Sequence, residues 1–186
     1  MIAFDPVLHE YRHNGIIIPS VTQILKEAGY INSDWYSSEA RDRGSAVHDL
    51  AERYIKGIRQ DDICRLLENL EYVNAFSSWI NKVGAYPIET ECLVHNTING
   101  KMYGGKFDLL CEIKGKRILV DYKTGAKAKW HPLQLAGYSL ACFEDGSRVN
   151  PDGVSALYLK ADGTYKFDCV PGMQWVKAIA EFKECL

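Results

Sequence analysis

The stretch Gly104-Gly105-Lys106-Phe107-Asp108-Leu109-Leu110, with Asp121-Tyr122-Lys123 after it, decides the fold that we expect of this chain. Residues 107–113 and 117–122 are both rich in apolar side chains, and the short connection 114–116 contains a glycine. Two such segments around a short turn predict a β-hairpin. Alternate side chains of a strand share a face, so Asp121 and Lys123 project the same way. Asp108 then lies across from Asp121 or on a diagonal to it.

This arrangement of two carboxylates and a lysine permits two interpretations. Two exposed acids and a lysine on an edge hairpin are the ordinary one, because a short D…DxK pattern is common. In the functional one, Asp108 and Asp121 bind a hard divalent cation through oxygen. The cation would polarise a phosphoryl oxygen and lower the pKa of a bound water, while Lys123 steadies that water or the developing negative charge.

A helical segment downstream favours the functional interpretation. Residues 130–142 predict a helix that opens near Pro132, a residue that is tolerated in the first turn of a helix. Gln134 and Tyr138 are four residues apart and therefore share one face of that helix. The pattern thus adds a polar stripe close to the two acids and the lysine.

Three further titratable residues are candidates for the same site. His48 and Glu52 share one face of a helix that we expect around residues 43–52. Glu52 could orient His48, bind metal through water or be an ordinary surface acid. Glu91 lies on the strand before the Asp108 strand, and there we expect it to face solvent, although it could be a further acid near the metal.

In this order, the pieces resemble the PD-(D/E)xK nucleases of the RecB-like branch, which includes phage-type exonucleases. Six residues occupy the positions of the family's motifs: His48 for the metal-binding histidine, Asp108 for the first acid in a G-x-x-D context, Asp121 and Lys123 for the D/E-x-K element, and Gln134 and Tyr138 for the Q-x-x-x-Y helix. Residues 9–25 also resemble the start of phage-type members, so the match extends over residues 9–138.

The resemblance implies a Mg²⁺- or Mn²⁺-dependent deoxyribonuclease that hydrolyses phosphodiester bonds. The metal would have four ligands: His48, Asp108, Asp121 and the backbone carbonyl of Tyr122. Lys123 would position or help deprotonate the attacking water, oriented by Gln134 and Tyr138. Four residues would contact DNA: Arg43, Lys127, Gln134 and Tyr138. Because such a site contacts phosphate and not bases, we expect little sequence specificity.

Function within this family has several possible forms. A small domain with no helicase or recognition module fits an exonuclease acting on single- or double-stranded DNA ends. The resemblance implies a role in phage, prophage or bacterial recombination and repair. A structure-selective endonuclease and a catalytically inactive nucleic-acid-binding member of the fold are the alternatives, and acids that merely face solvent would predict no metal dependence. Cleavage polarity, the physiological metal and the oligomeric state are left open.

The cysteines depart from one pattern within the family. Several relatives hold an iron-sulfur cluster with grouped cysteines, whereas the six here are scattered singly, without CxxC spacing: Cys64, Cys92, Cys111, Cys142, Cys169 and Cys185. Cluster and zinc ligation both need grouped thiolates, so we expect neither. Dispersed free cysteines are typical of a reducing cytoplasm, where they pack as small apolar residues.

Composition limits the remaining possibilities. The formal net charge of −2 argues against a broad nonspecific DNA-coating protein, but less against a nuclease whose acidic centre attracts phosphate once cations bind. We identify no signal peptide and no membrane span. The 186 residues suffice for one core and contain no linker. We expect a single domain over residues 1–186, with a hairpin and helices in 1–85 and the catalytic sheet and helices in 86–186.

The overall pattern predicts an α/β fold, a central mixed β-sheet flanked by helices, and the resemblance implies a restriction-endonuclease-like core. The expected strands are residues 7–13, 16–18, 87–96, 101–113, 117–122, 154–160 and 164–170. The expected helices are residues 20–29, 35–57, 61–83, 130–142 and 173–185.

Overall fold

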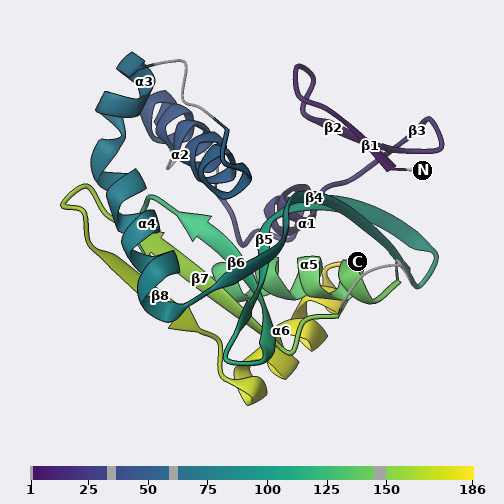
Figure 1. Cartoon of the computed structure of the whole chain (residues 1–186). Helices are drawn as coiled ribbons and strands as arrows, with labels where there is room; N and C mark the ends of the chain where they lie inside the picture. Colours follow the sequence, from purple (N-terminus) through teal and green to yellow (C-terminus); the bar gives the residue numbers. More distant parts are fainter. Residues whose placement is uncertain (1, 33–36, 59–62, 145–149) are drawn as a thin grey trace.

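A mixed sheet of five strands forms the centre of the computed structural model, which describes residues 2–32, 37–58, 63–144 and 150–186 (Figure 1). The strands follow the order β4-β5-β6-β7-β8, and the β6–β7 pair is parallel while the others are antiparallel. Their bounds are β4 Tyr86–Ile98, β5 Lys101–Ile113, β6 Lys116–Lys123, β7 Gly153–Leu159 and β8 Tyr165–Cys169. The predicted α/β fold with a mixed central sheet is therefore confirmed.

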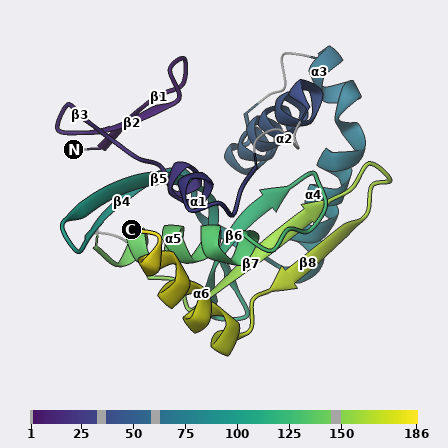
Figure 2. The same cartoon turned by 180° about the vertical axis from the view of Figure 1, so that it is seen from behind.

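Helices cover both faces of this sheet, as Figures 1 and 2 show from opposite sides. Their bounds are α1 Val21–Glu27, α2 Ser38–Lys56, α3 Ile63–Glu68, α4 Leu70–Val83, α5 His131–Glu144 and α6 Gly172–Glu184. One core lies between the sheet and α1, α5 and α6, and a second lies between the sheet and α2 and α4. Strand β7 contributes to both, because Ala156 belongs to the first and Leu157 to the second. Complete burial of a leucine such as Leu157 stabilises the fold by about 1.5–3 kcal/mol.

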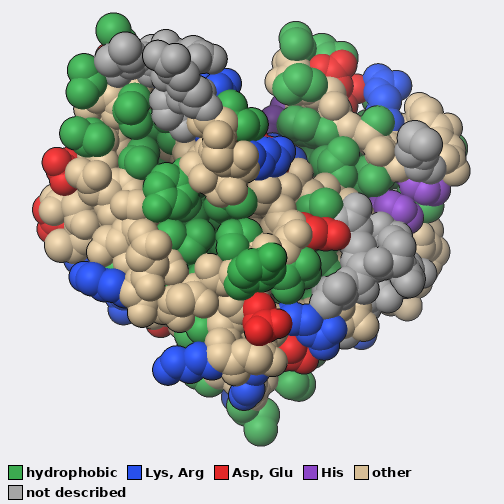
Figure 3. Space-filling model, in the orientation of Figure 1, with side chains coloured by type: hydrophobic (Ala, Val, Ile, Leu, Met, Phe, Trp, Pro, Cys, Tyr) green, Lys and Arg blue, Asp and Glu red, His purple; other side chains and the backbone are tan. Residues whose placement is uncertain are grey.

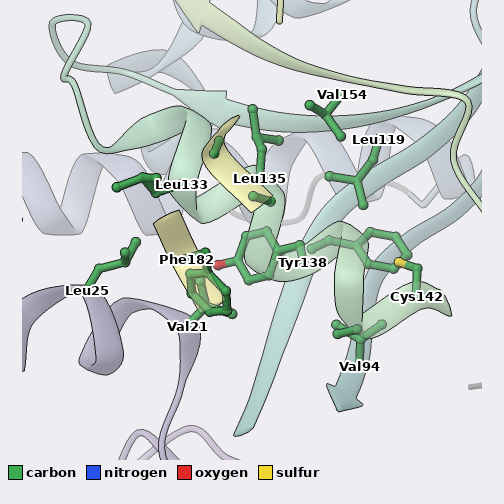
Figure 4. Packing of buried hydrophobic residues seen from close by; sticks show 14 of the residues in the cluster. Val21, Leu25, Val94, Leu119, Leu133, Leu135, Tyr138, Cys142, Val154 and Phe182 are labelled. Atoms are coloured by element: carbon green, nitrogen blue, oxygen red, sulfur yellow. The ribbon is translucent and has the colours of Figure 1, made fainter. Parts of the chain in front are cut away.

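The first core includes a residue that was predicted to be functional. Tyr138 of α5 lies among apolar side chains in Figure 4, close to Leu135 and Phe182. Its phenol ring packs against Gly105 of β5, where an added Cβ would lie only 2.7 Å from the ring. Glycine at this position therefore lets α5 approach the strand that carries Asp108.

A second, three-stranded antiparallel sheet precedes the large one and consists of β1 Ile2–Asp5, β2 Glu10–His13 and β3 Ile16–Ile18. The backbone N–H of Gly104 donates to the carbonyl of Pro19 at 2.9 Å and connects the small sheet to β5. A Cβ at position 104 would lie 3.1 Å from the terminal methyl groups of both Ile2 and Ile18. The absence of a side chain here allows the small sheet to pack directly on β5.

Two expected elements differ from those observed. We expected a strand over residues 7–13, but residues 6–9 form a turn, because the Asp5 side chain accepts hydrogen bonds from the backbone N–H groups of Val7 and Leu8. The helical region expected over residues 61–83 is divided in two, because Asn69 leaves helical geometry between α3 and α4, and its side-chain amide donates to the carbonyl of Arg65. The expected start of a helix at residue 35 falls outside the described residues.

The N-termini of two helices show how the sequence begins them. Ser20 and Gln23 form a reciprocal capping box at α1, and the Ser37 hydroxyl accepts a hydrogen bond from Ala40 at α2.

None of the described helices is both long and apolar enough to cross a membrane.

Candidate active site

Asp108 lies on β5 next to the point at which its hydrogen-bonded pairing with β6 ends. The last residues paired between these strands are Leu109 and Val120. Beyond them, the Asp108 carboxylate accepts the backbone N–H of Tyr122 and so replaces a backbone partner. Asp108 and Asp121 are 4% and 3% exposed, which is unusual for aspartate and favours a functional role over a solvated one.

His48 reaches Asp108 from helix α2. Its Nδ1 atom lies 3.2 Å from Asp108 Oδ1 and 3.8 Å from Glu91 Oε1, and its Nε2 atom lies 3.3 Å from the carbonyl oxygen of Tyr122. Burial acts to lower the pKa of His48, but the negative charges of Asp108 and Glu91 outweigh burial and raise the pKa to about 10. Without a cation, the imidazole is therefore positively charged at neutral pH and serves as the counter-charge of the two acids.

Glu91 belongs to this cluster, and our expectation that it faces solvent is wrong. Its side chain is only 9% exposed, and one carboxylate oxygen pairs with Lys106. Thr90 pairs with Leu109, and Cys92 with Phe107, so Glu91 stands opposite Asp108. The same count from the Asn99-Gly100 turn was available in the sequence. The φ of +50° at Glu91 is a left-handed conformation within a strand, a feature that often accompanies functional sites.

The second half of the site is a network around Lys123. The Lys123 ammonium contacts Asp121 Oδ2 and donates a hydrogen bond of 2.8 Å to Gln134 Oε1. The amide nitrogen of Gln134 donates to the hydroxyl of Tyr138 at 3.1 Å and to that of Thr22 at 3.4 Å. Gln134 therefore fixes the direction of the ammonium. Our reading of the sequence did not identify Thr22 in this role.

Charge within this network is set by burial and by Lys123. Burial raises the pKa of Asp121 to about 6, against the opposing effect of Lys123. The pKa of Asp108 is lowered instead, because its attraction to His48 outweighs burial. Burial also raises the pKa of Tyr138 well above its ordinary value, so that its hydroxyl remains neutral. We call Asp121, Lys123, Gln134 and Tyr138 the lysine network.

The lysine network and the cluster formed by His48, Glu91 and Asp108 border one cavity of about 480 Å³. Helix α2 lines one side with His48, the small sheet lines another with Phe4 and Tyr11, and the acids and Lys123 also border it. The space-filling view shows a notch in the surface between α2 and the small sheet (Figure 3). The cavity has the size of a typical ligand site.

Two predicted DNA-binding residues lie away from this cavity. Lys127 pairs with Asp168. Arg43 lines a neighbouring cavity of about 360 Å³, which adjoins the first at His48 and Lys123, and its guanidinium carbon lies 5.9 Å from the ring centroid of Tyr72. The structure thus brings together six predicted residues, namely His48, Asp108, Asp121, Lys123, Gln134 and Tyr138, and the carbonyl of Tyr122, but not Arg43 or Lys127.

A hard divalent cation fits one part of the site. Within the described ranges, His48, Glu91 and Asp108 offer ligand atoms that all lie within 4.8 Å of one another, and we call them the acid–histidine cluster. Glu91 Oε1 is buried without a hydrogen-bond partner, so it is available as a ligand atom. Two carboxylates and an imidazole suit Mg²⁺ or Mn²⁺. Asp121 borders the same cavity but does not belong to this group.

The profile of the PD-(D/E)XK nuclease superfamily matches residues 70–181, more than half of the 186 residues. The chain belongs to this superfamily. It is accordingly a nuclease-fold hydrolase whose substrate class is nucleic acid and whose family uses divalent metals. The matched region contains the lysine network and Asp108 but not His48, which reaches the site from an earlier helix.

Two solved structures resemble this chain to different degrees. A crystal structure of a "Putative exonuclease" from Eubacterium rectale is 15% identical, with a TM-score of 0.50 over 91% of this chain and 72% of that one. The crystal structure of a protein named SSO0001 is 18% identical, with a TM-score of 0.35 over 88% of this chain and 82% of that one. The curated proteins contain no significant match to the sequence. The first likeness supports a restriction-endonuclease-like fold.

Proposed function

We propose that this protein is a Mg²⁺- or Mn²⁺-dependent deoxyribonuclease that degrades DNA from its ends. The observation that carries the proposal is the meeting of the acid–histidine cluster and the lysine network in one cavity. A cluster of donors that fits one divalent cation, next to a lysine held in a fixed direction, has the parts that phosphodiester hydrolysis requires.

The acid–histidine cluster would hold the ion through His48, Glu91 and Asp108, with Asp121 and the carbonyl of Tyr122 as further ligands. Lewis-acid chemistry, in which a phosphoryl oxygen is polarised and the pKa of a water is lowered, would come from the bound cation. The protein's own contribution is the placement of these donors, since Asp108 is anchored by the Tyr122 N–H and His48 by helix α2.

Lys123 would act on the attacking water or on the charge that develops at phosphorus. Its side chain is 15% exposed, and its ammonium is already directed by Gln134, so little reorganisation is needed when substrate binds. Gln134 in turn is fixed by Tyr138 and Thr22. Gln134 and Tyr138 are therefore proposed to position Lys123, with the DNA backbone as their further partner.

The exonuclease assignment and the role in phage, prophage or bacterial recombination and repair rest on the resemblance to RecB-like enzymes, and the proposed cytoplasmic location rests on the dispersed free cysteines. A structure-selective endonuclease is the alternative among enzymes. The complete set of catalytic side chains and their mutual contacts argue against an inactive binding module. Arg43 and Lys127 remain candidates for contacts with more distant phosphates.

The decisive test is cleavage of end-labelled single- and double-stranded DNA with Mg²⁺, with Mn²⁺ and with EDTA. We expect metal-dependent release of short products from linear DNA, and none from circular single-stranded DNA. Asp108→Asn should abolish cleavage. Glu52→Gln is the matched control, because Glu52 borders the same cavity but pairs with Lys56 on the surface. Cleavage of circles would favour the endonuclease, and failure to cut any substrate would exclude the proposal.

A further inference from the structure

Three aromatic side chains of the small sheet form a wall of the cavity that the chemistry above does not use. They are Phe4, His9 and Tyr11. Phe4 and Tyr11 stand opposite each other on β1 and β2, with ring centroids 4.7 Å apart. The ring of His9 is nearly perpendicular to that of Phe4, at 84° and 5.2 Å between centroids. Tyr11 is buried and Phe4 half-buried, whereas His9 is exposed, so His9 offers the free aromatic surface.

The turn that carries His9 is held in place before any ligand arrives. Asp5 Oδ1 accepts the backbone N–H groups of Val7 at 2.9 Å and Leu8 at 3.0 Å. His9 has a φ of +54°, which directs its side chain out of the regular alternation of the strand. A ring on a preformed turn loses little freedom when it binds, which favours affinity.

The wall is also tied to the acid–histidine cluster. The small sheet packs on Gly104, four residues before Asp108. Lys106 lies between the two groups, since its ammonium pairs with Glu91 and is 5.8 Å from the ring centroid of Phe4. Burial, with Glu91 and Asp108 nearby, raises the pKa of Tyr11 to about 12. The rings and the acids therefore face one shared space and not two separate ones.

We propose that this wall is a nucleobase-binding subsite, in which His9 stacks on an unpaired base next to the phosphodiester bond that is cut. Aromatic side chains bind successive bases of single strands in this way, with little preference among bases. Inside a duplex, both faces of a base are covered by its neighbours, so stacking on His9 beside an internal phosphodiester bond requires an unpaired nucleotide. The substrate would then be a single-stranded end. This inference rests on the proposed nuclease function.

Lys106 adds a positive charge beside the aromatic rings of the subsite. A nucleotide places a flat apolar base and a charged phosphate side by side, and the wall places aromatic rings and an ammonium in the same order. With a cation bound at Glu91, the Lys106 ammonium would be available to a phosphate oxygen. An apolar peptide offers no anionic group to Lys106, so the charge favours a nucleotide.

The test measures KM and kcat for cleavage of short single-stranded DNA with Mn²⁺, using intact strands and strands that carry an abasic site at successive positions from the end. His9→Asn removes the ring, and asparagine tolerates the left-handed backbone. We expect it to raise KM roughly tenfold and to leave kcat nearly unchanged, as loss of one stacked base predicts. Phe4→Leu should act in the same direction. Val7→Ala, in the same turn but outside the cavity wall, is the control.

The abasic strands identify the base as the partner. For the unmodified protein, one abasic position should raise KM by a similar factor, and His9→Asn should add nothing further at that position. KM values of His9→Asn equal to those of Val7→Ala on every strand would overturn the subsite while the nuclease function stands. An equal loss on blunt duplex DNA would also overturn it, because the wall would then contact the backbone. If the unmodified protein cuts no strand at all, the proposed function itself fails.

Discussion

The acid–histidine cluster and the lysine network differ in how far their charged and polar atoms are already paired. In the acid–histidine cluster, Glu91 Oε1 is buried without a hydrogen bond, and the positive charges of His48 and Lys106 balance the two acids. In the lysine network, Asp121 Oδ2 likewise has no hydrogen bond but lies against the Lys123 ammonium, which donates to Gln134. The first half therefore offers donor atoms to a cation, whereas the second is paired internally. The difference indicates that metal binding and the positioning of the lysine can be separated by mutation.

The largest effect should come from Lys123→Ala. A group that acts on the transition state contributes roughly 10²–10⁴-fold to the rate, so single-turnover cleavage should fall by that factor. Binding of Mn²⁺ and of DNA should change little, because the acid–histidine cluster is intact. A cleavage rate within a few-fold of the unmodified protein would show that the lysine network is structural, and the comparison between the two halves would then fail.

Glu91→Gln should affect the other half. A metal that binds only the folded state stabilises it by about 2.7 kcal/mol at a concentration 100 times its Kd. We expect the rise in melting temperature on addition of Mn²⁺ to be lost in Glu91→Gln and in Asp108→Asn, and to persist in Glu52→Gln and Lys123→Ala. A full shift in Glu91→Gln would remove this residue from the metal site and leave Asp121 as the second acid.

Metal affinity should depend on pH in a direction that the structure specifies. The pKa of His48 is raised to about 10 in the metal-free protein, and a histidine must be neutral to bind a cation. Mn²⁺ must therefore displace a proton at neutral pH, and its affinity should fall roughly tenfold for each pH unit of acidification. Calorimetry in buffers with different heats of ionisation measures the released proton. An affinity that is constant through neutral pH would mean that His48 is already neutral.

The smallest effect concerns Tyr138→Phe. The ring keeps its packing against Gly105, and only the acceptor of the Gln134 amide is lost. Stability should therefore fall by about 1 kcal/mol, the contribution of one hydrogen bond, as measured by urea unfolding. Cleavage should fall by more than stability does, because Gln134 directs Lys123. Unchanged cleavage in both Tyr138→Phe and Gln134→Ala would assign this face of α5 to packing alone.

The sequence was most informative where local rules act. Apolar segments around the short connection 114–116 predicted the β5–β6 hairpin, because hairpin register follows directly from the turn. The sequence was less informative where a side chain competes with the backbone. Asp5 binds two backbone amides and turns an expected strand into a loop, and the Asn69 side chain caps α3 where one helical region was expected.

The site shows the same limit. The contact between His48 and Asp108 joins residues that are far apart in sequence, and it was anticipated only through a family resemblance. Glu91 was misjudged although the count from the Asn99-Gly100 turn places it opposite Asp108. Lys127 follows the active strand closely, yet Asp168 on β8 holds its ammonium. Such long-range partners depend on the packing of the whole sheet, which no local pattern encodes.

Gly104 and Gly105 have a consequence for how accurately the cavity is assembled. Side chains at neighbouring positions of a strand point to opposite faces. Here both positions are glycine, so the small sheet packs on one and the ring of Tyr138 on the other. The small sheet and the ring of Tyr138 therefore pack on the same short piece of main chain, which leads to Asp108. Because no side chain at these two positions separates the packed elements, the distances between the aromatic rings, the acids and the lysine depend on the main chain alone. The dipeptide therefore fixes the positions of the small sheet and of α5 relative to Asp108.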